Sequence, residues 1–126
     1  MSQPKIASSQ IDLGISLSST VIGAPLSNAK VMLVVAAQAF DISDTPSLTP
    51  SYGYADTTAT ADTDFDIQLN GLSVGTMAFA IGANMAIFTF PSPVSVALGD
   101  RISVVAPASP DSTLADIYFT IRGNLV

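Results

Sequence analysis

Three aspartates spaced two residues apart are the side chains of this sequence that could most directly carry chemistry: Asp62, Asp64 and Asp66. Residues two apart on a β-strand point to the same side, so these carboxylates would line one face at intervals of ~7 Å. Calcium takes about six to eight oxygen ligands, and such a row could donate some of them. The loop pattern D-x-[DN]-x-[DN]-G is not satisfied, however. We therefore expect the solvated outer face of a strand and no bound metal.

Catalytic groups are scarce in the rest of the chain. The sequence has no His and no Cys, so it lacks the usual general base, the thiolate nucleophile and the commonest metal ligands. Catalysis by a Ser–Lys or carboxylate pair is formally possible, but Lys5 and Lys30 lie in or near the N-terminal segment. We expect no catalytic residue, no enzymatic activity and no cofactor.

The tyrosines form a second group with possible chemistry. Tyr52, Tyr54 and Tyr118 could form the floor of a sugar site, because an aromatic face suits the C–H surface of a sugar. Tyr118 is opposite in phase to Ile117 and Phe119, so it should face away from the core or into a subunit contact. Ordinary tyrosines on the surface of a sheet are the simpler interpretation.

The element that dominates the pattern is a hairpin over Asp64 to Gly82. Apolar residues at 65, 67 and 69 alternate with polar ones, which predicts a half-buried strand. Asn70-Gly71 follows, and both residues tolerate the positive φ of a type I′ turn. Beyond Gly75 the apolar residues Met77, Phe79 and Ile81 continue in the other phase, which predicts a bulge at Gly75.

The N-terminal segment also alternates, with apolar residues at 11, 13, 15 and 17. This pattern is typical of a first strand of the domain, and equally of an extended arm that adds its edge to a neighbouring subunit. The sequence leaves both alternatives open.

Further strands follow along the chain. Val31 to Phe40 is apolar on both faces, which favours a strand covered on one side by the core and on the other by another subunit. Strands are also predicted within residues 51–63, 87–98, 102–106 and 117–121, with Pro91 and Pro93 marking a kink or an edge. About eight strands with turn signals every 8–12 residues predict an all-β fold, an antiparallel sandwich or barrel.

Composition limits the partners. At 126 residues the chain fits one domain, and its net charge of −6 argues against a nucleic-acid partner. The longest apolar run, Val31 to Ala37, is far shorter than the ~20 residues that span a bilayer. The start of the sequence has no apolar core of a secretory signal. We expect a soluble protein that binds neither nucleic acid nor membrane.

Four segments in this order and spacing resemble a known family: F-D-I-Q-L-N-G-L-S-V-G-T at 65–76, F-T-F at 88–90, A-L-G-D-R-I-S-V-V-A-P at 97–107, and D-S-T-L-A-D-I-Y-F-T-I-R-G at 111–123. Together they resemble the jelly-roll domain of tailed-bacteriophage virion proteins, including tail-fibre tips and capsid decoration (cement) proteins. The resemblance implies a trimeric β-sandwich carried on a phage particle. A fibre would usually place a long shaft or anchoring domain first, whereas this chain has only a short arm, which favours a decoration protein.

These observations combine into one expectation. Residues 1–19 form an N-terminal extended arm or edge strand, and residues 20–126 form a jelly-roll-like β-sandwich. The protein is expected to bind itself as a homotrimer and the major capsid protein on the capsid exterior. The residues expected to contact the capsid or a neighbouring subunit are Ile11, Leu13, Ile15 and Leu17. The alternative is a tail-fibre, receptor-binding or carbohydrate-binding β-sandwich module that recognises a host glycan.

Overall fold

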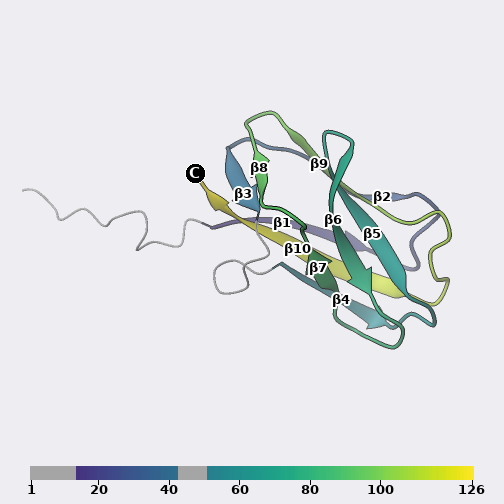
Figure 1. The fold of residues 1–126 in the computed structure, drawn as a ribbon. Coiled ribbons are helices and arrows are strands. Elements are labelled where there is room, and N and C mark those ends of the chain that lie inside the picture. The colour runs from purple at the N-terminus through teal and green to yellow at the C-terminus, as the bar shows by residue number, and fades with distance from the viewer. Residues whose placement is uncertain (1–13, 43–50) are drawn as a thin grey trace, which may run out of the picture.

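The computed structural model describes residues 14–42 and 51–126, which form two antiparallel five-stranded sheets packed face to face (Figure 1). The first sheet contains β1 (Gly14–Val21), β10 (Ala115–Leu125), β3 (Phe40–Ile42), β8 (Val94–Val96) and β4 (Tyr52–Thr57). The second contains β2 (Lys30–Val35), β9 (Arg101–Val105), β5 (Thr63–Leu69), β6 (Leu72–Phe79) and β7 (Ile87–Thr89). Within these ranges no helix could cross a bilayer.

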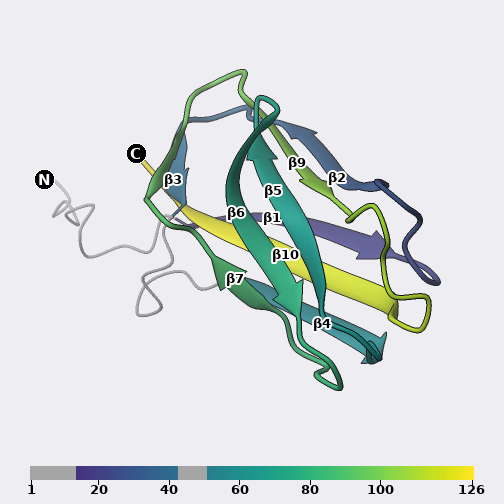
Figure 2. The ribbon, with the colours of Figure 1, turned by 45° about the vertical axis from the view of Figure 1, so that its right-hand side comes forward.

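The strand order is that of a jelly roll, which confirms the predicted fold class. The main path of the first sheet is β1-β10-β3-β8 and that of the second is β2-β9-β5-β6, with β7 added at its edge. Most connections pass from one sheet to the other, and the first and last strands lie side by side (Figure 2). Each sheet therefore needs strands from both ends of the chain.

The central hairpin is confirmed. β5 and β6 pair through the Asn70-Gly71 turn, whose φ values of 52° and 86° match the positive φ that was expected. The register passes from Ile67↔Gly75 to Gln68↔Ser73, so the extra residue of the bulge is Val74, next to Gly75. A Cβ on Gly75 would lie 2.5 Å from Cδ1 of Phe90. Only a residue without a side chain allows that buried ring to pack there.

Two strand ends were predicted wrongly. The expected phase of Met77 and Phe79 does not continue to Ile81, because β6 ends at Phe79 and Ile81 lies in the following turn, 65% exposed. The strand expected to reach Leu98 ends at Val96, and Leu98 is exposed in a turn. Both apolar residues lie where the chain reverses, a feature that alternation alone does not reveal.

The prediction of one strand over Val31 to Phe40 is also wrong in extent. β2 ends at Val35, and Phe40 opens β3 in the opposite sheet. The change of sheet begins at Ala36, whose N–H donates to the Asp100 carbonyl at 2.7 Å. The run from Val31 to Phe40 is thus divided into two strands, and the segment with the two prolines is divided into β7 and β8. These two divisions raise the strand number from about eight, as expected, to ten.

The core lies between the two sheets and is built from the inward residues of each strand. Phe65 and Phe79 face each other across the hairpin, with ring centroids 6.1 Å apart and planes at 76°. This edge-to-face geometry is favourable for aromatic pairs. The other large, fully buried side chains are Phe40, Ile42, Ile67, Met77, Ile102, Leu114, Ile117, Ile121 and Val104.

Asp111 ties two loops at one end of the sandwich. Its Oδ2 accepts from the Thr60 hydroxyl at 2.7 Å and from the Thr60 N–H, while Oδ1 accepts from the N–H groups of Thr113 and Leu114. The bond from the Thr60 hydroxyl, helped by the backbone donors, lowers the pKa of Asp111 to about 2. The carboxylate thus holds the β4–β5 loop against the β9–β10 loop.

Replacing Phe65 with Ala should lower the free energy of unfolding by ~3–5 kcal/mol, because a fully buried ring leaves a cavity. Denaturant unfolding measures this loss. Asp64→Ala is the matched control, since Asp64 lies on the exposed face of the same strand, and its effect should stay within ~0.5 kcal/mol. Equal losses at the two positions would show that the register of β5 is wrong.

The second prediction concerns acid stability. The folded pKa of Asp111 lies below the ordinary value of 3.8, so its stabilising contribution is present above pH 3.8 and is lost as the pH falls toward about 2. Asp111→Asn should therefore lower the melting temperature at neutral pH and flatten its decline between these values. Melting curves across this range test it, with Asp64→Asn as the control. An unchanged acid decline in Asp111→Asn would contradict the prediction.

Candidate functional site

The segment expected to contact a partner begins outside the described residues, where Ile11 and Leu13 lie. Ile15 and Leu17 belong to β1, which pairs with β10 from Gly14↔Asn124 to Val21↔Ile117. Their side chains are half-buried and pack against the core. Residues 14–19 therefore form an edge strand of the sandwich, and the expected capsid or subunit contact of the four residues stays a prediction.

Among the described strands, the outer side of β1 is an unpaired edge. β1 ends the path of its sheet, with β10 as its one neighbour in that path. None of its residues, G-I-S-L-S-S-T-V, is a proline or a charged residue, the types that usually protect an edge from pairing with another chain. This edge could accept an added strand.

Two of the three aspartates accept hydrogen bonds that belong to the fold. Asp62 precedes β5, and its Oδ1 accepts from the Ile81 N–H at 2.8 Å. Asp66 accepts from the Gln68 side chain at 2.8 Å and from the Ser73 hydroxyl. Within residues 14–42 and 51–126, no group of three or more Asp, Glu, His or Cys side chains could hold a metal ion.

One motif with possible chemistry escapes an analysis by strand pattern alone. Residues 71–75 read G-L-S-V-G, which has the G-x-S-x-G spacing of a nucleophile elbow. That elbow joins a strand to a helix, whereas this pentapeptide runs from a hairpin turn into β6. The Ser73 hydroxyl donates to Asp66, and the sequence has no histidine to serve as base. The hairpin turn explains Gly71, and the bulge next to Gly75 explains the second glycine of the motif.

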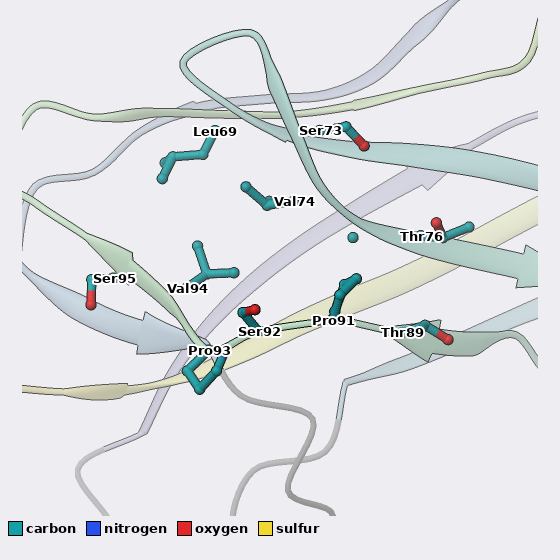
Figure 3. A pocket seen from close by; sticks show the side chains of 11 residues that line it. Leu69, Ser73, Val74, Thr76, Thr89, Pro91, Ser92, Pro93, Val94 and Ser95 are labelled. Carbon is teal, nitrogen blue, oxygen red and sulfur yellow. The ribbon is translucent and has the colours of Figure 1, made fainter.

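A groove of about 450 Å³ opens between β6 and the segment that joins β7 to β8 (Figure 3). Val74 and Thr76 line it from β6, and Pro91 and Pro93 line it from the opposite side. Serine and threonine hydroxyls complete a lining without charged side chains. The groove offers no group for acid–base chemistry.

The three tyrosines, 52, 54 and 118, come together on the outer face of the first sheet. Tyr54 pairs directly with Tyr118, their ring centroids are 5.4 Å apart, and Tyr52 pairs with Thr120. The prediction that Tyr118 faces away from the core is confirmed, since Ile117 and Phe119 are buried on either side of it. Spacing could not show that Tyr54 and Tyr118 are neighbours, because the pairing joins strands distant in sequence.

The face continues onto β1. Thr20 pairs with Tyr118, and Ser18 pairs with Thr120, with their hydroxyl oxygens 2.8 Å apart. Six side chains that each carry a hydroxyl thus form two rows of three across adjacent strands. We name this set the hydroxyl face: Ser18, Thr20, Tyr52, Tyr54, Tyr118 and Thr120.

Asp56 sets the electrostatics at one end of the hydroxyl face. The Tyr118 hydroxyl donates to Asp56 Oδ1 at 2.7 Å. This bond, with desolvation and the carboxylate charge, raises the pKa of Tyr118 to about 12. The phenol therefore stays neutral, and its hydroxyl is held in a fixed direction.

Comparison of the sequence with protein-family models finds no matching family, and comparison with curated proteins finds no similar chain.

The bond to Asp56 predicts an unusual alkaline titration. One of the three tyrosines should ionise near pH 12, and Asp56→Asn should move that step toward the ordinary value of 10. Absorbance of the phenolate follows the titration, and Tyr118→Phe should remove the late step. Because the folded pKa is raised, the stabilising contribution is present below pH 10 and lost toward pH 12. A late step that survives in Tyr118→Phe would refute the assignment.

Proposed function

We propose that the protein is a capsid decoration protein of a bacteriophage, a homotrimer that binds the major capsid protein on the exterior of the assembled shell. Its jelly-roll strand order supports this proposal, because that fold is common in viral capsid proteins. The resemblance of residues 65–123 to phage virion domains supports it as well. The same fold serves many functions, so the proposal also needs support from the exposed side chains of this protein.

The observation that carries the proposal is the uncovered apolar face of β2. Met32 is buried and Val34 half-buried, whereas Leu33 and Val35 point to the other face with 66% and 67% of their surface exposed. β2 is an edge strand, and a hollow of about 370 Å³ lies beside both residues over β9 and β5. Covering a side chain of this size contributes ~1.5–3 kcal/mol, which favours a partner on this face.

More exposed apolar side chains lie in or directly after the turns near the end of β2. Leu98 and Leu72 are 71% and 74% exposed. Their turns are joined by hydrogen bonds, since the Asn70 side chain donates to Asp100, and the Gly99 N–H donates to the Ala36 carbonyl. We call Leu33, Val35, Leu72 and Leu98 the apolar end. Several exposed apolar side chains near one end of a molecule favour a protein partner there.

The proposed action is mechanical. A protein that binds the assembled shell, and not its separate subunits, stabilises the shell by mass action, and the gain grows with its free concentration relative to the dissociation constant. A trimer adds avidity, because three linked contacts hold better than one. Neither effect requires a reactive side chain.

The test uses the double variant Leu33→Ser/Val35→Ser. Losing both apolar contacts should convert the trimer into a folded monomer and reduce binding to undecorated capsids of the source phage. Sedimentation velocity measures the oligomeric state, and co-sedimentation with capsids measures binding. Ile87→Ser is the matched control, since Ile87 is 66% exposed on the opposite edge strand of the same sheet.

Two outcomes would contradict the proposal. The first is a parent protein that is monomeric at micromolar concentration, and the second is a parent protein that does not sediment with undecorated capsids. A truncated protein that lacks residues 1–13 keeps all of β1. It distinguishes the contact with the capsid from the contact between subunits. If it stays trimeric but releases the capsid, the N-terminal segment binds the shell and the apolar end joins the subunits.

A further inference from the structure

The hydroxyl face is a surface without an assigned role in the proposed contacts. It lies on the sheet opposite the one that carries Leu33 and Val35. Its six side chains reach it from three adjacent strands, β4, β10 and β1. The three tyrosines are 57%, 39% and 43% exposed in chain order. The fold therefore places three large aromatic side chains on a surface that one chain leaves open.

This face is hollowed as well as aromatic. A depression of about 330 Å³ is lined by all six residues of the hydroxyl face and by Met85. Such a volume is at the low end for small-molecule sites. Met85 approaches from the β6–β7 loop, where it forms a bridge with Tyr54. The depression thus has a wall as well as a floor.

Small inward residues set the position of the floor. Gly53 lies between Tyr52 and Tyr54 and points to the core, where an added Cβ would come within 3.0 Å of Ala86 and 3.3 Å of the Met77 sulfur. Ala55 is fully buried on the same side of β4. Because β4 packs this closely on the core, the two tyrosines must project outward.

We propose that the hydroxyl face binds an uncharged glycan, with a pyranose ring against Tyr52, Tyr54 and Tyr118. The C–H surface of a sugar packs on an aromatic ring, and the ring hydroxyls need partners that both donate and accept. Every side chain of the hydroxyl face carries a hydroxyl with both capacities. The bond from Tyr118 to Asp56 uses the phenolic proton and orients the phenolic oxygen as an acceptor.

Charge at the Tyr118 end of the face disfavours an acidic sugar there. Asp56 lies beside Tyr118 at one end, where its carboxylate would repel a sialic or uronic acid. Arg122 follows Thr120 on the same strand and pairs with Ser16 at the other end. The six residues between these ends are uncharged. The aliphatic side chains of the apolar end, which suit a protein partner, lie on another part of the molecule.

The experiment applies the intact protein to an array of neutral and acidic bacterial and mammalian glycans. The best ligand is then measured by saturation-transfer NMR, beside methyl glucoside, methyl galactoside and methyl mannoside. We expect binding to neutral glycans, with saturation transferred to the C–H protons of the sugar. Tyr54→Ala and Tyr52→Ser should each weaken binding about tenfold or more, through loss of an aromatic contact. Tyr54→Phe should keep most of the affinity.

The controls separate this site from general loss of structure and from the capsid proposal. Leu26→Ala removes a 77% exposed apolar side chain outside both the hydroxyl face and the apolar end, and it should leave glycan binding unchanged. Melting temperatures show whether each variant is folded. Because the assay needs no capsid, its result is independent of the proposed decoration role. Absence of binding to every neutral glycan would overturn the proposal, as would preference for acidic glycans, or equal binding by folded Tyr54→Ala and parent protein.

Discussion

The register of β10 is the constraint on which most of this structure depends. This strand hydrogen-bonds β1 along one side and β4 and β3 along the other. Because side chains alternate, Ile117, Phe119 and Ile121 enter the core while Tyr118 and Thr120 reach the outer surface. A slip of one residue would exchange the two sets. The core and the hydroxyl face therefore depend on the same set of backbone hydrogen bonds.

Features with local causes could be predicted from the sequence. The hairpin was one of them, because strand alternation and the Asn70-Gly71 turn lie within a few residues of each other. A kink or an edge at Pro91 and Pro93 was another, because proline cannot donate to a sheet. The bulge was predicted at Gly75, one position from its actual place. The Phe90 ring, which packs against Gly75 beside the bulge, comes from outside the local pattern.

Features set by distant contacts could not be predicted in this way. The apolar run from Val31 shows no sign of the change of sheet at Ala36, because the hydrogen bonds responsible come from the turn at Gly99 and Asp100. The hydroxyl face has the same origin. Tyr54 and Tyr118 were singled out by residue type, but their adjacency depends on how β4 pairs with β10. Local pattern thus indicated the candidate residues, and pairing determined which of them meet.

The pairing of the first and last strands has a consequence for protein engineering. Gly14 lies opposite Asn124, so the two ends of the described fold are neighbours at one corner of the sandwich. A short linker could join them, and the chain could be reopened at the exposed Asn70-Gly71 turn as a circular permutant. Likewise, cargo fused before β1 and cargo fused after β10 would emerge side by side. The domain is therefore suited to bring two attached modules together.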